Sequence, residues 1–309
     1  MSIEQKIPFY GEIVCQHSLK PCKNNAYYSL KKQNKVLYVC GVHSRSCKDE
    51  RKELEKDPDR KEKLQLAYDD RNKEIKKVAR INKNKNRKGN IILQKMRMMR
   101  TPNYIQGYMN IFPNYLHGKR KDGLGLPELS PKYIGPIEHG QPNLPIALNL
   151  ENFHQFNKCF ESEVDKKGNP LPIFFKTQRE GYLDEIPHRH KQTATGNAPL
   201  FSIWVTSNGE KKKMTYIESR QFYCTFYERA VKHEDSYIKL KDMVKSGYNI
   251  CICGYDAYPL KVENGDIEQI IEECYLDASK PFGHELVLYS MLMLKKNQYP
   301  WRKYKTEDF

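Results

Sequence analysis

The sequence predicts an α+β fold, in which a small N-terminal module and a charged connector precede a mainly helical C-terminal domain. Three observations predict it. Apolar residues recur with helical spacing in four segments, at 149–160, 215–233, 236–246 and 283–295. The segment 249–260 begins NICIC and alternates Ile with Cys, as a buried strand does. Near the N-terminus, cysteines recur where apolar residues are too few for an independent core.

The overall composition bounds the class of protein. With 309 residues, the chain can form one main domain of about 200 residues and a smaller attachment. Its 39% content of hydrophobic residues argues against general disorder. No apolar segment approaches the roughly 18 residues that cross a bilayer, and no N-terminal stretch resembles a secretory signal. We therefore expect an intracellular protein, in the cytoplasm or nucleus, without a membrane partner.

The first predicted element is a metal-binding module over residues 1–48. Its candidate ligands follow the pattern C-x6-C-x17-C-x2-H and are Cys15, Cys22, Cys40 and His43. Four such ligands complete a tetrahedral Zn²⁺ shell and leave no open position, so we expect a structural zinc ion and no organic cofactor. His17 and Cys47 are alternative ligands, and ordinary reduced thiols are the alternative interpretation. The run also resembles short zinc-binding segments of the form PCKNxA…YxCGxH in proteins of large DNA viruses, which is compatible with a viral or virion-associated protein.

A charged connector is predicted over residues 49–100, with two helical pieces separated by Pro58. Residues 71–100 carry 12 Lys and Arg against 1 Glu, a net charge of +11 out of the total of +15. Such a block neutralises nucleic-acid phosphates, so we expect nucleic-acid contact through residues 71–100. A solvated linker and a nuclear-targeting signal are the alternatives. The candidate contact residues are Lys83, Lys85, Arg87, Lys88, Lys95, Arg97 and Arg100.

The C-terminal domain is predicted over residues 101–309. Its first helix, at 149–160, places Glu151, Gln155 and Lys158 at spacings of four and three, so the three polar side chains share one face. Such a row is typical of a binding site, although an isolated row of this kind also occurs as a solvated stripe. Short extended pieces are expected at 171–176 and 200–206, and the two cysteines of the NICIC strand are expected in the core.

In order along the chain, these segments resemble the NADAR family. Its members share an E-x3-Q-x2-K helix after an L/F-S-x-F/P segment, then a Trp before a second helix, a strand ending near an Asp, and a terminal L-G-x-x-L-M helix. The matching residues here are Leu129-Ser130-Pro131, Glu151, Gln155, Lys158, Trp204, Gly254-Tyr255-Asp256 and Phe282-Gly283. The chain departs from the family after Asp256, where Ala257 and Tyr258 replace a Trp-Gly pair, and in the last helix.

The resemblance implies cleavage of N-glycosidic bonds, in ribosylated pyrimidine intermediates or in ADP-ribose attached to guanine in DNA. Such cleavage needs a carboxyl group for proton transfer and a second anion to stabilise developing positive charge. Glu151 and Asp256 are the candidates for these catalytic roles, and an ADP-ribose-like or nucleotide ligand is expected. The candidate substrate-binding residues are Gln155, Lys158, Trp204, Arg220, Tyr223, His284 and Glu285.

Several of these residues have a structural alternative. Trp204 is expected either to stack on a base or to lie in the core. Arg220 is expected either to bind a phosphate or to pair with Glu218 or Glu228 on its own helix. The last helix is expected to begin with an N-cap at or near Ser279, so that His284 and Glu285 lie in its first turn, beside a ligand phosphate or complementing the helix dipole.

Two functions of other classes compete with hydrolysis. One is a nucleic-acid-binding virion protein whose C-terminal domain is only a scaffold. The other is a nucleotide-sugar-dependent DNA glycosyltransferase, which requires a donor pocket and usually a divalent cation near Asp256. An enzyme of the first kind requires Glu151 and Asp256 to converge, whereas a scaffold does not.

Overall fold

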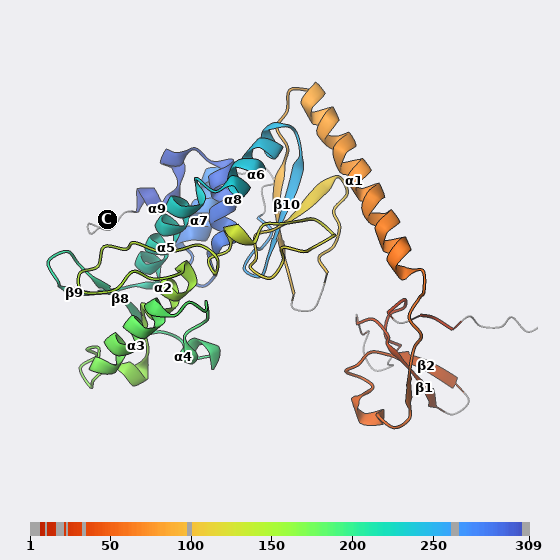
Figure 1. Cartoon of the computed structure of the whole chain (residues 1–309), viewed down its shortest axis with the longest axis horizontal. Helices are drawn as coiled ribbons and strands as arrows, with labels where there is room; N and C mark the ends of the chain where they lie inside the picture. The colour runs from red at the N-terminus through yellow and green to blue at the C-terminus, as the bar shows by residue number, and fades with distance from the viewer. Residues whose placement is uncertain are drawn as a thin grey trace, which may run out of the picture. The chain divides into compact units, whose positions relative to one another are not determined.

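A computed structural model describes residues 7–9, 11–16, 22, 24–32, 35–97, 101–260 and 266–304. The fold is α+β, as the sequence predicts (Figure 1). The chain forms two compact units, Met1–Asp70 and Arg71–Phe309, and the division falls within a helix instead of at residues 48 and 100. Within the described ranges, no helix combines the length and apolar character that a membrane crossing requires.

The N-terminal unit is built on a three-stranded antiparallel sheet. Its strands β1 (Tyr28–Lys32), β2 (Lys35–Val39) and β3 (Arg51–Glu53) have the order β2-β1-β3. Its buried hydrophobic cluster consists of Cys15, Leu30, Val39 and Cys40. Two of these four residues are cysteines, so aliphatic burial alone gives this unit little stability.

The C-terminal unit contains a parallel sheet of the order β4-β10-β5-β6. Its strands are β4 (Ile91–Lys95), β5 (Tyr108–Phe112), β6 (Leu124–Gly125) and β10 (Asn249–Gly254). The predicted NICIC strand is confirmed as β10, the neighbour of both β4 and β5. Because all four strands run in the same direction, the loops after β5 and β10 lie at one edge of the sheet, where ligands commonly bind in parallel sheets.

Within the described residues, a second, antiparallel sheet and the helices α2 to α9 complete this unit. The sheet order is β7-β8-β9, with β7 (Lys158–Cys159), β8 (Phe201–Val205) and β9 (Lys211–Met214). The helices after α1 are α2 (Leu150–Phe156), α3 (Pro172–Leu183), α4 (Lys191–Ala194), α5 (Tyr216–Val231), α6 (Asp235–Lys245), α7 (Ile267–Leu276), α8 (His284–Met293) and α9 (Pro300–Lys303).

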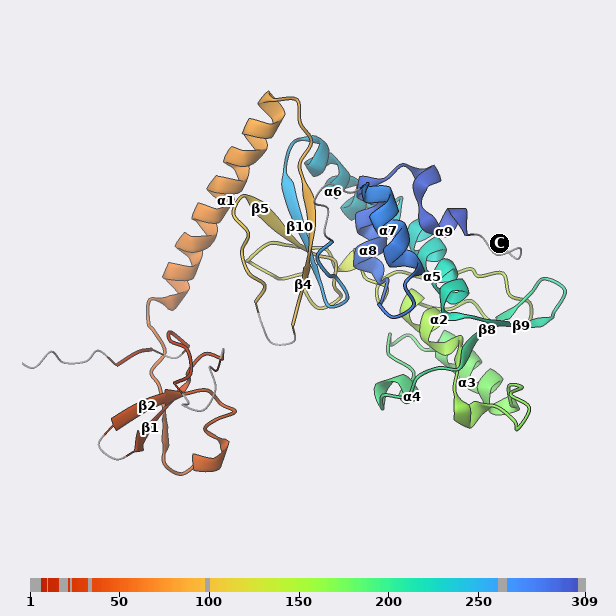
Figure 2. The ribbon, with the colours of Figure 1, turned by 180° about the vertical axis from the view of Figure 1, so that it is seen from behind.

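Helix α8 lies at the centre of the main core. Figure 2 shows it between the parallel sheet and α5, and it packs against β4, β10 and α5. Its seven residues from Glu285 to Met291 are all buried, as expected for a helix that is apolar on every side. On β10, Ile250 and Ile252 face this core, whereas Cys251 and Cys253 face a smaller cluster on the opposite side of the sheet. The prediction that these cysteines belong to the core is confirmed.

The connector differs from its prediction. The structure has one long helix after Pro58, α1 (Arg60–Asn84), and before Pro58 only a short turn at Arg45–Cys47 and strand β3. Asn82 of α1 donates hydrogen bonds to the carbonyl of Gly247 and the side chain of Asn249. Strand β4, which also belongs to the basic block, pairs with β10. The basic block is therefore part of the C-terminal unit and not a flexible tether, because its apolar residues are needed in the core.

Two further boundaries differ. The segment 171–176, expected to be extended, begins helix α3, which Pro172 opens at its first position. The first predicted helix ends at Phe156 instead of 160. Its start is fixed by Asn149, whose side chain accepts a hydrogen bond from the amide of Asn152. Its end is fixed by Asn157, which accepts hydrogen bonds from Gln178 and Tyr182 of α3.

Candidate active site and metal cluster

Four potential metal ligands meet in the N-terminal unit. The ligand atoms of Cys15, Cys22, Cys40 and His43 all lie within 4.8 Å of one another. Nδ1 of His43 is 3.3 Å from Sγ of Cys15 and 3.5 Å from Sγ of Cys40, and the Sγ atoms of Cys22 and Cys40 are 4.0 Å apart. This group can hold a metal ion. Cys47 is a described residue outside the group, and His17 lies outside the described residues.

The surroundings of Cys40 favour its thiolate form. Burial alone would raise the pKa of this thiol, but hydrogen bonds from the backbone of His43 and the side chain of Asn24 lower it below its usual value. The Nδ2 atom of Asn24 lies 3.8 Å from the Cys40 sulfur. A thiolate is the form that binds metal, so the folded chain presents this ligand in a suitable state.

In the C-terminal unit, the predicted row of polar side chains is ordered by direct contacts. Nε2 of Gln155 donates to Oε1 of Glu151 at 3.2 Å, and Nζ of Lys158 donates to Oε1 of Gln155 at 3.2 Å. The helix carries only the first two residues, and Lys158 comes from β7 directly after it. The three side chains are therefore adjacent, as predicted, although the helix is shorter than expected.

The amine of Lys158 lies within electrostatic range of both candidate catalytic carboxylates. Its pKa is lowered from 10.5 to about 8, chiefly by burial and in part by Arg189, while Glu151 and Asp256 oppose the decrease. Glu151 precedes Lys158 by seven residues, whereas Asp256 follows the distant strand β10. Both carboxylates therefore lie within electrostatic range of one half-buried amine.

Two glycines bring Glu285 of α8 close to Asp256. A Cβ on Gly254 would lie 1.8 Å from Oε1 of Glu285, so only glycine fits there without displacing the carboxyl group. A Cβ on Gly283 would lie 3.0 Å from both Oε2 of Glu285 and Cβ of Asp256. Gly283, and not Ser279, is the N-cap of this helix. The expected N-cap, Ser279, lies instead in a separate turn at 277–280, which ends before the helix begins.

Tyr223 of α5 connects the two ends of the cluster. Burial raises its pKa well above the usual value, and Glu151, Tyr227 and Glu285 raise it further. The rings of Tyr223 and Tyr227 stack at 6.4 Å, and Tyr227 donates a hydrogen bond to the carbonyl of Leu129. Both phenols therefore stay protonated near neutral pH. Tyr223 is thus a neutral group within electrostatic range of both Glu151 of α2 and Glu285 of α8.

Arg220 has a structural role that differs from both expectations. Its guanidinium donates to the carbonyl oxygens of Cys274, Tyr275, Asp277 and Lys280, at the end of α7 and in the turn beyond it. With 3% of its surface exposed, it has its donors directed at backbone and not at a ligand. The structure therefore corrects the expectation that Arg220 binds a phosphate, Glu218 or Glu228. The carbonyl oxygens at the end of a helix have no partners within the helix, and Arg220 supplies donors to them.

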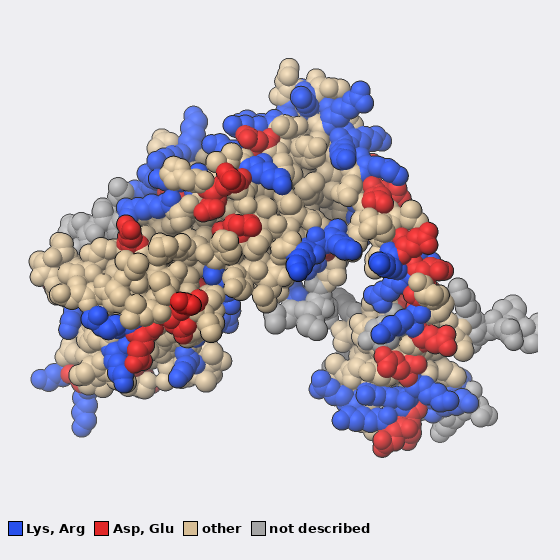
Figure 3. All heavy atoms as spheres, in the orientation of Figure 1, with Lys and Arg blue, Asp and Glu red and all other residues tan. Residues whose placement is uncertain are grey.

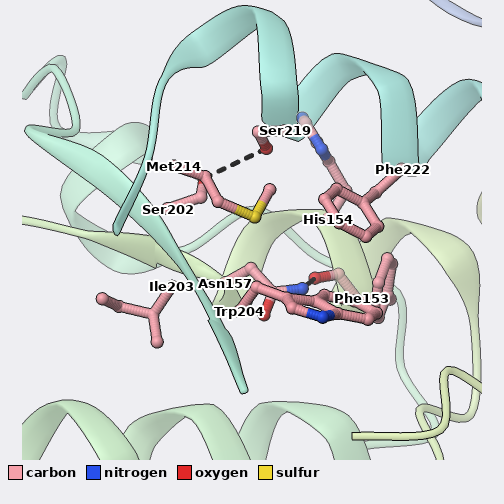
Figure 4. Close-up of a pocket in the computed structure, with 9 residues that line it drawn as sticks. All are labelled: Phe153, His154, Asn157, Ser202, Ile203, Trp204, Met214, Ser219 and Phe222. Atoms are coloured by element: carbon pink, nitrogen blue, oxygen red, sulfur yellow. Dashed lines mark hydrogen bonds between the residues drawn. The ribbon is translucent and has the colours of Figure 1, made fainter. Parts of the chain in front are cut away.

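Trp204 lies in the core, the second of the two expectations. It is 6% exposed and stacks on Phe222 with ring centroids 4.1 Å apart. It lines a small cavity together with Phe153, His154, Asn157, Ser202, Ile203, Met214, Ser219 and Phe222 (Figure 4). This cavity has room for about one water molecule. We therefore take the carboxylate and amine cluster as the candidate site, because the cavity is too small for a ribose and Trp204 cannot stack on a base there.

Sequence reasoning missed two residues near the cluster. Arg189 acts on the pKa of Lys158, and its side chain has no hydrogen bond or ion pair within the described part of the chain. His154 lies 4.9 Å from Tyr223, and burial, Lys158 and Arg220 lower its pKa well below the usual value. Arg189 lies in an irregular segment without periodicity, so no sequence signal identified it. His154 lies inside the E-x3-Q-x2-K segment and could have been found from that position.

Exposed cations cover the outer face of the C-terminal half of α1. Ile75 and Ala79 of this segment are buried against the unit. Lys76, Lys77 and Arg80 are exposed, and so are the predicted contact residues Lys83, Lys85, Arg87, Lys88, Lys95 and Arg97. Figure 3 shows Lys and Arg side chains gathered over this end of the helix. Arg100 lies outside the described residues.

Comparisons with protein-family models, curated proteins and solved structures find no match to this chain. The family resemblance therefore remains a prediction, and function must be argued from the site itself.

Proposed function

We propose that the C-terminal unit hydrolyses an N-glycosidic bond of an ADP-ribosylated or ribosylated nucleobase, with ADP-ribosyl-guanine in DNA as the favoured substrate. The observation that carries the proposal is that Glu151 and Asp256 both act electrostatically on the half-buried amine of Lys158. Two carboxylates from distant segments, meeting beside one cation, fit a reaction that moves a proton and develops positive charge on a ribose. The resemblance to the NADAR family points to the same reaction.

In the proposed reaction, the bond between C1′ of the ribose and the base nitrogen breaks, and its electron pair goes to the base. Water adds its hydroxide to C1′ and its proton to the base, so Glu151 takes the proton from water and passes it to the leaving nitrogen. Asp256 stabilises the positive charge that develops on the ribose. Lys158 and Gln155 orient Glu151 through the hydrogen bonds that connect the three side chains.

Arg189 replaces Arg220 as the proposed phosphate-binding residue. It lies near the amine of Lys158, whereas the donors of Arg220 are directed at backbone carbonyls. A guanidinium binds phosphate oxygens through paired hydrogen bonds, and the diphosphate of an ADP-ribose-like ligand offers such oxygens. Tyr223 and His284, on neighbouring helices, are proposed to line the same site.

The exposed cations of α1 support a nucleic-acid substrate. Asn82 and strand β4 fix this helix segment to the unit that holds the candidate site. Nucleic-acid contact through this face would therefore hold a DNA substrate on the same compact unit as the carboxylates. The same face favours the second candidate function, a nucleic-acid-binding protein without catalysis, in which the basic face binds phosphates and the carboxylates have no substrate.

We propose structural zinc for the N-terminal cluster. For tetrahedral bonds of about 2.3 Å to sulfur and 2.1 Å to nitrogen, two sulfurs lie about 3.8 Å apart and a sulfur and a nitrogen about 3.6 Å apart. The measured separations of 4.0 Å between Cys22 and Cys40 and of 3.3 and 3.5 Å from His43 to Cys15 and Cys40 fit these values. Zinc would also add the folding free energy that the small core of this unit lacks.

Hydrolysis of a defined oligonucleotide carrying one ADP-ribosyl-guanine tests the proposal. Chromatography should detect released ADP-ribose with the wild-type protein, and Glu151→Gln should lower kcat at least about 100-fold, the range expected for loss of acid–base catalysis. Glu180→Gln on α3 is the matched control, since the carboxylate of Glu180 is 66% exposed and has no part in the proposed mechanism. Unchanged hydrolysis by Glu151→Gln would refute the proposed mechanism. Wild-type protein that binds the DNA without cleaving it would favour the non-catalytic function.

A further inference from the structure

An exposed apolar tip marks the loop after β5, residues 114–123 with the sequence NYLHGKRKDG. Tyr115 and Leu116 at this tip are 43% and 86% exposed, whereas Asn114 directly before them is buried. An isolated apolar side chain on a surface needs no explanation. Two adjacent ones, on a loop at the sheet edge where ligands commonly bind, indicate a surface that a partner covers.

Contacts with β10 and the residues after it fix this loop close to Asp256. Nδ2 of the buried Asn114 donates a hydrogen bond to the carbonyl of Cys253, near the end of β10, at 2.9 Å. The ring centroid of His117 lies 6.1 Å from that of Tyr255, the residue before Asp256. Tyr255 is itself 37% exposed, so it adds an exposed ring beside the loop.

The base of the loop is closed by backbone contacts. Nε2 of His284, at the start of α8, donates to the carbonyl of Pro113 at 2.8 Å. A Cβ on Gly125 would lie 2.1 Å from the carbonyl oxygen of His117, so the returning chain packs directly on the outgoing chain. The amide of Arg120 donates to the same carbonyl at 3.2 Å. The loop therefore has a defined shape, which holds its exposed tip in place.

The charges of the loop favour a polyanion as the partner. Its one acidic residue, Asp122, is bonded to the guanidinium of Arg120 by two hydrogen bonds, and the side chains of Arg120 and Asp122 are 20% and 6% exposed. The pKa of His117 is lowered, chiefly by burial and in part by Arg120, so its ring is neutral near neutral pH. Lys119 and Lys121 are exposed and make no ion pair within the described residues. The loop thus presents two cations and no uncompensated anion.

We infer that this loop binds the DNA strand next to the modified base. Tyr115 and Leu116 pack against a neighbouring unpaired base. Lys119 and Lys121 contact the phosphates of the same stretch of strand. Proteins that hold single strands combine such side chains, on which bases stack, with cations along the backbone. Charge complementarity therefore favours DNA over a protein as the occupant of this patch.

The inference rests on the nucleic-acid substrate of the proposed function, because it states how that substrate is held beside Asp256. It does not depend on hydrolysis. It also adds a second contact to the basic face of α1, on the same compact unit.

Binding of single-stranded DNA to the full chain tests the inference without cleavage. The probe is an unmodified, fluorescently labelled strand of about 12 nucleotides, and its anisotropy gives the affinity over a range of salt concentrations. Tyr115→Ala should weaken binding about tenfold, and Leu116→Ala about fivefold, with the salt dependence unchanged, because stacking releases no counterions. Lys119→Gln combined with Lys121→Gln should instead reduce the slope of log K against log salt by about 1.4, since each phosphate contact on a single strand contributes about 0.7.

Matched controls come from the region of α3. Ile173 is 49% exposed, and Lys166 and Lys167 are exposed as well. Ile173→Ala, and Lys166→Gln combined with Lys167→Gln, should leave both the affinity and the slope unchanged. The two tryptophans, Trp204 and Trp301, are both buried in the C-terminal unit, so their fluorescence in urea shows whether each variant of that unit is folded.

A photochemical cross-link locates the contact directly. A strand carrying 5-iodouracil beside a central guanine should, on irradiation, attach to a peptide that contains Tyr115 or Tyr255. Cross-links found only on peptides of α1 would overturn the inference.

The outcomes separate this inference from the proposed hydrolysis. If the wild type cleaves nothing but the loop variants weaken binding as expected, hydrolysis fails and the loop contact holds. If the wild type cleaves ADP-ribosyl-guanine DNA and the loop variants bind the strand as the wild type does, only the loop contact fails. A wild-type protein that does not bind the strand would overturn the inference as well.

Discussion

Replacement of Lys158 by Met should stabilise the C-terminal unit near neutral pH while removing activity. Lys158 is half-buried, and the pKa of its amine is lowered from 10.5 to about 8, chiefly by desolvation. Below pH 8 the folded protein must hold a charged amine in a poorly solvated place, whereas in the unfolded chain the same amine is fully hydrated. Methionine has similar length and no charge, so it removes this cost.

The magnitude and its sign follow from the two pKa values. Between pH 8 and 10.5 the unfolded chain binds more protons at this residue than the folded protein, so wild-type stability rises with pH in that window. The difference between 10.5 and about 8 corresponds to a destabilisation of about 3 kcal/mol at pH 7, which falls to about 1 kcal/mol at pH 9.5. Loss of the hydrogen bond to Gln155 costs the variant about 1 kcal/mol. Lys158→Met should therefore be more stable by about 2 kcal/mol at pH 7 and equal to wild type at pH 9.5.

Urea titration followed by tryptophan fluorescence measures this difference at pH 7.0 and 9.5. Lys176→Met on α3 is the matched control, because its side chain is 70% exposed and makes a single surface ion pair with Glu180 at 3.8 Å. Its effect should stay within about 0.5 kcal/mol at both pH values. The reasoning is refuted if Lys158→Met is less stable than wild type at pH 7, or if its advantage does not shrink at the higher pH.

The remaining predictions concern other parts of the molecule. Arg220→Ala should lower the free energy of unfolding by about 3 kcal/mol, because carbonyls at the end of α7 lose their donor, and an unchanged urea midpoint would contradict that role. Arg189→Ala should raise KM for an ADP-ribosylated substrate about tenfold with stability unchanged, whereas an effect on kcat alone would argue against phosphate binding. Cys40→Ser should release the bound metal, measured by elemental analysis, without altering tryptophan fluorescence; retention of one equivalent would exclude this ligand set. Reversing Arg80 and Lys83 to Glu should weaken duplex DNA binding at low salt and reduce the slope of log K against log salt by about two, and an unchanged slope would exclude this face.

The parts of the fold that the sequence predicted are those with strong local signals. Helix α5 begins at Tyr216, directly after its N-cap Thr215, whose side chain forms a capping box with Glu218, and the predicted segment starts at 215. Strand β10 was predicted because its two faces carry different side chains, and both faces are buried as that pattern requires. In these segments local preference and tertiary environment agree, so the sequence alone was sufficient.

The failures have a common physical cause, since each depends on contacts between distant segments. The segment at 171–176 is helical because it continues into α3, which packs on Asn157 through Gln178 and Tyr182. The basic block is predicted as part of a charged connector outside the main domain because its charges dominate its composition, yet Ile91 and Leu93 are buried in the main core. Charge density along a sequence does not show which few apolar residues the fold will use.

For the candidate site, the sequence supplied the residue types but not their roles. Glu151 and Asp256 are predicted from separate motifs, and only the fold places both within electrostatic range of one amine, that of Lys158. Arg220 is predicted to bind a phosphate, but its donors are already hydrogen-bonded to backbone carbonyls. Arg189 belongs to no motif, so the sequence does not identify it. An arginine that binds phosphate and an arginine that binds carbonyls look alike in a sequence, because both need only the same five donors.

The candidate site lowers the stability of the C-terminal unit, and this loss of stability is itself an argument about function. A chain that used this domain only as a scaffold would gain stability from an apolar side chain in place of Lys158, and would not need Gly254 and Gly283 to bring the carboxyl group of Glu285 close to Asp256. Strained or poorly solvated ionisable groups that weaken a fold are typical of sites where they act on a ligand. If Lys158→Met is more stable and can neither bind nor cleave an ADP-ribosylated nucleotide, function explains why the amine of Lys158 is kept. If the variant is more stable and nothing else changes, the scaffold interpretation is favoured.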